Sequence, residues 1–185
     1  MGYALNSSTV VAVIGAGSMG AGIAQLAAQS GHSVRLFDTQ PGASERALVR
    51  IEDDLASAVK RGKLDAAEST KVRERLTAAD RIEALEGCGL VVEAIIEKLD
   101  VKQALFKQLE LVLGEHAVLA TNTSSISITA VAQNLSHPQR LIGWHFFNPA
   151  TRMKLVEVIS GVETDPALAQ EMHRSEERRV GKECA

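Results

Sequence analysis

The chain has 185 residues, of which 45% are apolar and 23% are charged, and it contains only 4 Pro beside 14 Gly. This composition predicts one globular domain with a hydrophobic core and excludes a disordered, fibrous or disulfide-built chain. The formal charge is −3 and aromatic residues make up 3% of the chain. The protein therefore lacks the positive field and the stacking side chains of a nucleic-acid-binding protein.

Cysteines and targeting signals give little sign of special chemistry. Cys88 and Cys184 lie far apart and belong to no Cys-x-x-Cys or Cys/His pattern, so we predict no metal site and a reduced, cytoplasmic location. The first residues lack the basic and apolar segments of a secretory signal peptide, and no apolar stretch approaches the roughly 18 residues that span a bilayer. We expect a soluble protein without a membrane partner.

The chain begins with a β-α-β unit. Residues 9–14 form a continuous β-branched apolar run, which is typical of a strand buried on both faces, and an Ala-rich helix follows over residues 18–30. A second strand is predicted over residues 33–38. Residues 41–87 then show a helical pattern, with Leu48, Ile51, Leu55 and Val59 on one apolar stripe and charged residues elsewhere. We therefore expect a charged helical hairpin that projects from the sheet. Asp65 is expected to cap its second helix.

Strands and helices alternate again after residue 87. We predict strands over residues 90–94, 117–120, 141–146 and 155–159, with helices over 100–113 and 127–135 between them. This order predicts an α/β fold of the Rossmann type, a doubly wound and mostly parallel sheet with an inserted helical hairpin. One domain is expected over residues 1–172. Residues 173–185 are highly charged and show no helical stripe, so we expect a solvated tail.

A glycine-rich loop follows the first predicted strand. Gly15, Gly17 and Gly20 form a G-x-G-x-x-G pattern that also contains Ser18 and Met19, and the predicted helix begins within it. In a dinucleotide site the first glycine permits the tight turn, the second lets the backbone approach the pyrophosphate, and the third allows close helix–strand packing. The helix N-terminus attracts the phosphates. The motif and its context therefore predict a dinucleotide site.

Asp38 ends the second predicted strand, 18 residues beyond Gly20. A carboxylate there accepts hydrogen bonds from both hydroxyls of the adenosine ribose and repels a 2′-phosphate. Thr39 and Gln40 follow it, and this loop offers no basic side chain, so NAD is favoured over NADP. Two alternatives stay open: a plain glycine turn with Asp38 as a helix cap, and a flavin or another adenine nucleotide.

Further polar residues follow the ends of the later strands, where ligands bind in open α/β sheets. These are residues 93–97, residues 121–125 and residues 145–149. Glu157 lies in the final predicted strand, 12 residues beyond His145. His145 has the chemistry to accept a hydroxyl proton while hydride leaves the same carbon, and a nearby carboxylate would fix its tautomer. The alternatives are a hydrogen-bonded core histidine, a solvent-side Glu157, and a simple turn and helix cap at residues 122–125.

Taken together, these segments resemble the NAD-binding domain of the 3-hydroxyacyl-CoA dehydrogenases. The resemblance covers about residues 10–172 through residues 13–24, 91–97, 122–125, 145–149 and 153–158. It implies oxidation of L-3-hydroxyacyl-CoA to 3-ketoacyl-CoA, in fatty-acid or phenylacetate-type degradation. His145 matches the general base, and Glu157 matches the carboxylate that orients it. Ser124 matches the residue that binds the substrate oxygen.

The resemblance also implies further ligand contacts. Ser124 and Asn148 would face the nicotinamide, while Glu97 and Lys102 match other cofactor contacts. The helical hairpin matches one that lies along coenzyme A in the family. We select Lys60 as a phosphate contact and Lys63 as a second candidate, against the alternative that both are charges on a solvated helix.

Residues 61–64 and 121–129 are especially similar to bacterial enzymes that act on 3-hydroxyadipyl-CoA, and 3-hydroxybutyryl-CoA enzymes are close competitors. Thr151 and Arg152 stand where the family usually has Pro and an aliphatic residue. The family continues into an all-helical domain that completes the acyl pocket and forms the dimer interface, and we expect that domain to be absent here. Residues after Met172 resemble a frame change, truncation or cloning remnant. The competing hypothesis is a catalytically silent NAD-binding fragment or a structural protein of the same fold.

Overall fold

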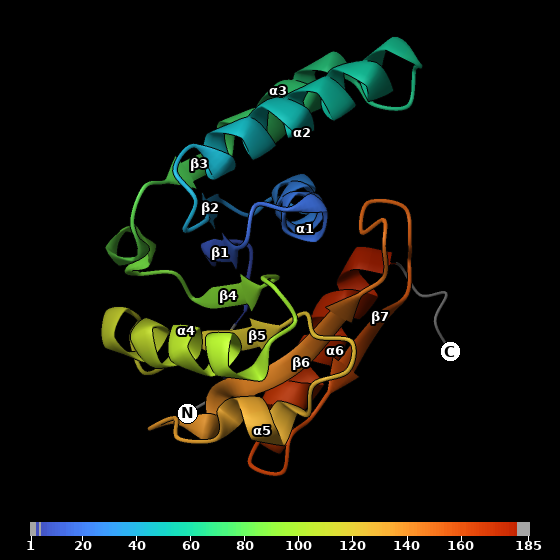
Figure 1. Ribbon diagram of the computed structural model, residues 1–185. Helices are drawn as coiled ribbons and strands as arrows, with labels where there is room; N and C mark the ends of the chain where they lie inside the picture. Colours follow the sequence, from blue (N-terminus) through green and yellow to red (C-terminus); the bar gives the residue numbers. More distant parts are fainter. Residues whose placement is uncertain (1–2, 4, 181–185) are drawn as a thin grey trace.

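The computed structural model describes residue 3 and residues 5–180, with the side chains of residues 175–180 excepted (Figure 1). Within this part of the chain one sheet contains seven strands in the order β3-β2-β1-β4-β5-β6-β7. Their bounds are β1 Val11–Ile14, β2 Val34–Phe37, β3 Leu76–Ala79, β4 Leu90–Glu93, β5 Val118–Thr121, β6 Leu141–Phe146 and β7 Val156–Ile159. Each neighbouring pair is parallel except β6 and β7, which are antiparallel. The predicted doubly wound, mostly parallel sheet is confirmed.

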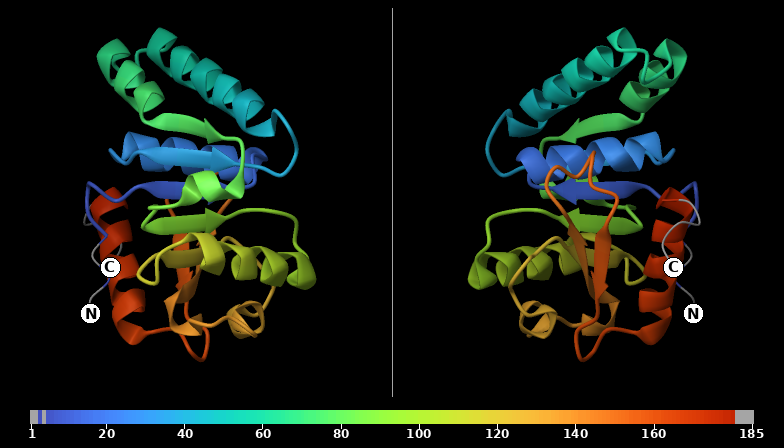
Figure 2. Two further views of the ribbon diagram at one scale, coloured as in Figure 1. Left: turned by 90° about the vertical axis from the view of Figure 1, so that its left-hand side faces the viewer. Right: turned by 90° about the vertical axis from the view of Figure 1, so that its right-hand side faces the viewer.

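Helices cover both faces of this sheet (Figure 2). Helices α1 (Ser18–Gln29) and α6 (Pro166–Val180) lie on one face, and α4 (Leu99–Val112) and α5 (Ile128–Ala132) lie on the other. Successive strand residues point to opposite faces, so Val11 and Val13 join the core under α1 whereas Ala12 and Ile14 join the core under α4. This double burial explains why β1 is a continuous apolar run.

The predicted helical hairpin is confirmed as α2 (Ala43–Lys60) and α3 (Ala66–Glu74), which lie across the β3 edge of the molecule (Figure 1). Ile51 and Leu55 of α2 and Val72 of α3 are buried in the core on the α1 face. The side chain of Asp65 accepts hydrogen bonds from the backbone N–H groups of Ala67 and Glu68, at 2.8 and 3.3 Å, and thereby caps α3. The turn between the helices is exposed.

The prediction that residues 41–87 are helical throughout is wrong for its last part. Strand β3 follows α3 directly and pairs in parallel with β2, with Leu76 opposite Val34 and Ala79 opposite Phe37. A short 3₁₀ turn, η1 (Ile82–Leu85), then leads to β4. The four residues of β3 are too few and too rich in alanine to show a strand period, and pairing with β2 decides their conformation.

The predicted tail also differs from the structure, because α6 continues to Val180 and residues 173–180 are helical. Leu168 and Met172 are fully buried in the core, which fixes the first half of α6. Arg174 donates to Glu171 at 2.7 Å one turn earlier. Arg and Glu are good helix formers, so a helix nucleated by packing extends through the charged segment. Residues 181–185 of the predicted tail lie outside the described residues.

A second 3₁₀ turn, η2 (Pro138–Arg140), leads into β6. In the described part of the chain, no helix has the length and apolar character required to cross a membrane.

Candidate active site

The glycine loop joins β1 to α1, and two of its glycines are required by packing. Gly15 has a φ of +100°, and a Cβ atom there would lie 2.5 Å from the carbonyl oxygen of Ala94. A Cβ at Gly20 would lie 1.7 Å from the carbonyl oxygen of Gly15. Both positions therefore need glycine for the close helix–strand approach that the motif predicts.

Gly17 differs from these two, because no heavy atom lies within 4 Å of the position that its Cβ would occupy. Gly17 is the N-cap of α1, and no described side chain caps this helix or places a carboxylate in its first turn. Gly17 and Ser18 are exposed and Met19 is half-buried. The N-terminus of α1 thus presents backbone and positive dipole to an open space, which fits a pyrophosphate.

Asp38 is held beside this loop at the end of β2. Its Oδ2 accepts from the N–H of Ala16 at 2.7 Å, and its Oδ1 accepts from the N–H of Gln40 at 2.9 Å. Helix α2 has Gly42 as its N-cap, so the alternative of Asp38 as a helix cap is wrong. Each carboxylate oxygen retains acceptor capacity, which fits the hydroxyls of an adenosine ribose.

Sequence reasoning missed one basic group at the glycine loop. Arg50 of α2 donates from Nη2 to the carbonyl oxygen of Ala16 at 2.8 Å. It lies 12 residues beyond Asp38 in the printed sequence, and only the return of α2 over the loop brings it there. The loop after β2 contains no basic residue, but α2 supplies one to the neighbouring segment.

His145 and Glu157 form a hydrogen-bonded pair. They lie directly opposite each other in the antiparallel register of β6 and β7, and His145 Nδ1 is 2.8 Å from Glu157 Oε2. Trp144 and Phe146 belong to the core on the α1 face, so His145, between them, points to the other face. Its side chain is 15% exposed and that of Glu157 is 50% exposed. The ring of Phe147 packs beside the imidazole, with 4.7 Å between ring centroids.

Ser124 lies in a tethered loop after β5. The loop is fixed to β6 because Asn122 Oδ1 accepts from the N–H of Phe146 at 2.8 Å. Glu97 Oε1 accepts from the N–H groups of Ser124 and Ser125, at 3.1 and 3.3 Å, and from the hydroxyl of Thr123. Ser124 itself is exposed. The loop is therefore held by long-range contacts and is more than a local turn.

Lys102, which the family resemblance matches to a cofactor contact, is buried in the structure. Its side chain is only 1% exposed, and its ammonium lies 2.6 Å from Glu93 Oε1 and 3.3 Å from Glu97 Oε2. Burial would raise the pKa of Glu97, but hydrogen bonds from Thr123 and the charge of Lys102 outweigh it and lower this pKa. Glu97 is thus an anion that faces both the buried lysine and the exposed loop.

These groups meet at one edge of the sheet. The glycine loop, Glu93, Ser124 and His145 lie at or just after the carboxyl ends of β1, β4, β5 and β6, which are consecutive neighbours in the sheet. Strands β2 and β4 flank β1 on opposite sides, so the direction in which strands are added to the sheet reverses at β1. Open α/β sheets bind nucleotides at such a switch point. Asn148 is exposed just beyond β6, before a cis peptide bond to Pro149.

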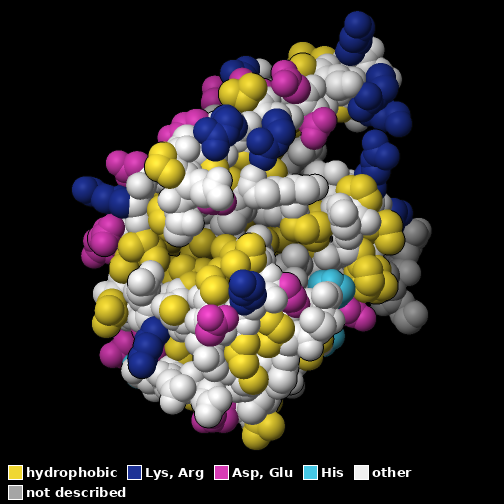
Figure 3. Space-filling model, in the orientation of Figure 1, with side chains coloured by type: hydrophobic (Ala, Val, Ile, Leu, Met, Phe, Trp, Pro, Cys, Tyr) yellow, Lys and Arg dark blue, Asp and Glu magenta, His cyan; other side chains and the backbone are white. Residues whose placement is uncertain are grey.

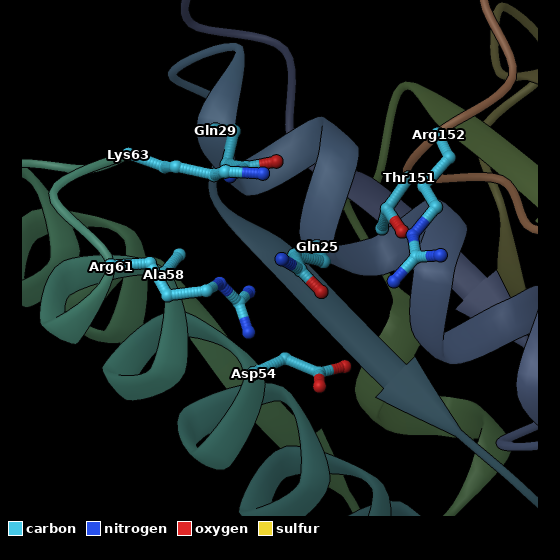
Figure 4. Close-up of a pocket in the computed structure, with 8 residues that line it drawn as sticks. All are labelled: Gln25, Gln29, Asp54, Ala58, Arg61, Lys63, Thr151 and Arg152. Carbon is cyan, nitrogen blue, oxygen red and sulfur yellow. The ribbon is translucent and has the colours of Figure 1, made fainter.

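A cavity of about 710 Å³ lies between α1, the end of α2 and the β6–β7 loop. Figure 4 shows the guanidinium groups of Arg61 and Arg152 extending into it from opposite sides, with Lys63 near Gln29. Lys and Arg side chains gather over the α2–α3 turn in Figure 3. Lys60 is exposed and does not line this cavity, whereas Arg61 and Arg152, which sequence reasoning did not select, do.

Comparison with known proteins identifies the family. A family model described as 3-hydroxyacyl-CoA dehydrogenase, NAD binding domain, matches residues 10–184. The 3-hydroxyadipyl-CoA dehydrogenase of Escherichia coli K12 is 49% identical over 162 residues, which are 88% of this chain and 34% of that protein. The probable 3-hydroxybutyryl-CoA dehydrogenase of Bacillus subtilis 168 is 43% identical over 159 residues, 86% of this chain and 55% of that protein.

Solved structures agree with this result. The crystal structure of 3-hydroxybutyryl-CoA dehydrogenase from Escherichia coli K12 has a TM-score of 0.91 and 47% identity, covering 95% of this chain and 37% of that one. For FadB2 of M. tuberculosis the TM-score is 0.90 and the identity 36%, covering 96% and 63%. The chain spans less than two thirds of each of these four relatives. Its cofactor is NAD, and the chain belongs to the family of 3-hydroxyacyl-CoA dehydrogenase NAD-binding domains.

Proposed function

We propose that the protein to which this domain belongs oxidises L-3-hydroxyacyl-CoA to 3-ketoacyl-CoA, with His145 as the general base. The observation that supports this most directly is the 2.8 Å contact between His145 Nδ1 and Glu157 Oε2 at the sheet edge that also contains the glycine loop. A carboxylate at Nδ1 favours the tautomer with the proton on that nitrogen, which makes Nε2 the acceptor.

In this proposal His145 Nε2 takes the proton of the substrate hydroxyl as the C3 carbonyl forms. Glu157 then stabilises the imidazolium at the distance already present between the two side chains. NAD, when bound, supplies the nicotinamide that accepts the hydride from C3. Ser124 donates a hydrogen bond to the substrate oxygen, and Ser124 and Asn148 border the nicotinamide end. The exposure of Ser124 and Asn148 supports this role.

The cofactor would lie across the carboxyl ends of β1 and β4. Gly15, Gly17 and Gly20, with Ser18 and Met19, would hold the pyrophosphate at α1, and Asp38 would bind the adenosine ribose. Glu97, whose side chain is 39% exposed, would contact the cofactor near the nicotinamide ribose. Lys102 would support this contact from the buried side of Glu97, since its ammonium binds both Glu93 and Glu97.

The acyl-CoA would enter beside the helical hairpin. We assign its phosphates to the cavity between α1 and α2, where Arg61, Lys63 and Arg152 offer three cations against the single carboxylate of Asp54. The named relatives act on 3-hydroxyadipyl-CoA and 3-hydroxybutyryl-CoA, so the substrate class is a short-chain 3-hydroxyacyl-CoA. A cytoplasmic location and dimerisation through a helical domain are the further parts of this proposal.

Calorimetric titration and a turnover assay test the proposal together. We expect the chain to bind NADH at least about tenfold more tightly than NADPH, because Asp38 repels the 2′-phosphate. With acetoacetyl-CoA, oxidation of NADH by the protein should fall roughly a hundredfold to ten-thousandfold in His145→Gln and be unchanged in His116→Gln. His116 is exposed and lies at the opposite edge of the sheet, so it is the matched control.

The outcomes separate the candidate functions. Equal or tighter binding of NADPH would contradict the assignment of Asp38. NADH binding without turnover in both forms of this chain would favour the silent NAD-binding alternative for the polypeptide itself.

A further inference from the structure

We infer that Glu93 is a positioning residue, which together with Lys102 and Glu97 fixes the loop that presents Ser124. This inference rests on the proposed function, because the loop matters to catalysis only if Ser124 binds the substrate oxygen. Glu93 ends β4, pairs with Ile14 of β1 across the strand register, and is 0% exposed. A carboxylate buried this deeply at the nucleotide switch point requires an explanation.

Glu93 is fully engaged by three donors. Its Oε1 accepts from the ammonium of Lys102 at 2.6 Å and from the N–H of Ile95 at 2.7 Å, and its Oε2 accepts from the hydroxyl of Thr121 at 2.7 Å. The carboxylate thus joins the ends of β4 and β5 to the first turn of α4. Because these contacts are short and involve a charged carboxylate, they hold the ammonium of Lys102 in one position.

Lys102 transmits this position to Glu97. The same ammonium reaches Glu97 Oε2 at 3.3 Å, and the other oxygen of Glu97 accepts from the N–H groups of Ser124 and Ser125. Contacts therefore run without interruption from the buried Glu93 to the backbone of Ser124. A displacement of about 1 Å at a group that contacts substrate can reduce a rate by roughly a hundredfold.

A positioning role accounts for the arrangement better than stability does. A buried ion pair gains little over a packed apolar pair, since desolvation offsets much of its attraction. At the opposite end of α4 the same architecture recurs: Glu110 pairs with the buried Arg140 at 3.5 Å and accepts from the N–H groups of Ser136 and His137. That site tethers a loop remote from the proposed chemistry, and so it provides an internal control.

Glu93→Gln, the double variant Glu93→Gln/Lys102→Met, and Glu110→Gln form the test set. Amide hydrogen exchange of Ser124 and Ser125 measures the loop directly, and titrations with NADH and acetoacetyl-CoA measure the site. We expect exchange at Ser124 and Ser125 to rise by roughly tenfold in both Glu93 variants. Acetoacetyl-CoA binding should weaken by a similar factor. In Glu110→Gln exchange should rise only at Ser136 and His137, with both affinities unchanged.

The double variant separates positioning from folding, because it leaves no uncompensated buried charge. If Glu93→Gln alone fails to fold, this variant decides. Native exchange at Ser124 and Ser125 and native affinities in a folded double variant would overturn the inference. Failure of the unaltered chain to bind NADH would instead contradict the proposed function, while the exchange result would still report on the tether.

Discussion

Single glycines in the β1–α1 loop have different roles, although they belong to one motif. Gly20→Ala places a methyl group 1.7 Å from the carbonyl oxygen of Gly15, so the helix must move away from the strand. We expect a loss of about 3 kcal/mol in the free energy of unfolding, measured by urea denaturation.

Gly17→Ala meets no atom within 4 Å and has an ordinary φ of −71°. It should retain stability within about 1 kcal/mol but weaken NADH binding by roughly tenfold, because the methyl would occupy the space that we assign to the pyrophosphate. Equal NADH affinity in Gly17→Ala and the unaltered chain would contradict this assignment.

Glu97 makes stability depend on pH in the acid range. Its pKa lies below the ordinary glutamate value of about 4.3, since hydrogen bonds from Thr123 and the charge of Lys102 outweigh desolvation. The folded state therefore releases this proton more readily than the unfolded state. The resulting stability is present above pH 4.3 or so and is lost as pH falls through the lower folded pKa. In urea titrations from pH 7 to about pH 3, the unaltered chain should lose more stability than Glu97→Gln. Parallel curves would show that the hydrogen bonds do not favour the anion.

At the scale of elements, the helical hairpin could be predicted from the hydrophobic pattern of the sequence, whereas β3 could not. Helix α2 has a buried stripe that includes Ile51 and Leu55, and α3 has a cap at Asp65, so both helices could be predicted. Strand β3 has neither feature, and its conformation comes from pairing with β2. Helix α6 extends past the predicted boundary for a related reason, because burial of Met172 fixes a helix whose later residues show no stripe. Tertiary contacts determine these elements more than local sequence does.

The cap of α3 has a consequence for the neighbouring turn. Asp65→Ala removes the acceptor of two backbone N–H groups, so unfolding free energy should fall by about 1 kcal/mol. Asp65 closely follows Arg61 and Lys63, so loss of the cap should also loosen the turn that carries these two cations. Coenzyme A should therefore bind more weakly, whereas NADH affinity should be unchanged. Asp53→Ala, an exposed position within α2, is the matched control for loss of charge. A reduced NADH affinity in Asp65→Ala would mean that the hairpin and the nucleotide site are coupled.

At the scale of the whole molecule, the candidate site contains some residues that could be predicted from the sequence and others that could not. His145 and Glu157 are 12 residues apart, and only the antiparallel register of β6 and β7 brings them to 2.8 Å. Their chemistry and the family resemblance predict them as candidates without that register. Arg152 belongs to no motif, and its place in the cavity depends on how the β6–β7 loop packs against α1. Long-range packing of this kind leaves no local signal in a single sequence.

The net charge of this protein is negative, but the charge around one cavity is positive. The salt dependence of ligand affinity distinguishes the effects of the two. The formal charge of −3 opposes any anion at long range, yet Arg61, Lys63 and Arg152 surround one cavity. Electrostatic attraction at these exposed cations is screened within about 10 Å at 0.1 M salt. We expect coenzyme A affinity to fall steeply between about 0.05 and 0.5 M salt. NADH affinity should change less, because we propose that backbone N–H groups and a helix terminus hold this ligand.

Variants locate this salt dependence. Arg61→Gln and Arg152→Gln should each weaken coenzyme A at low salt and flatten its salt dependence, because each removes one of the attracting charges. Lys107→Gln, which changes an exposed lysine of α4 on the other face of the sheet, is the control. It should leave both the affinity and its salt dependence unaltered. If all three variants weakened coenzyme A equally, the effect would follow net charge rather than position, and the cavity between α1 and α2 would lose its assignment as the coenzyme A site.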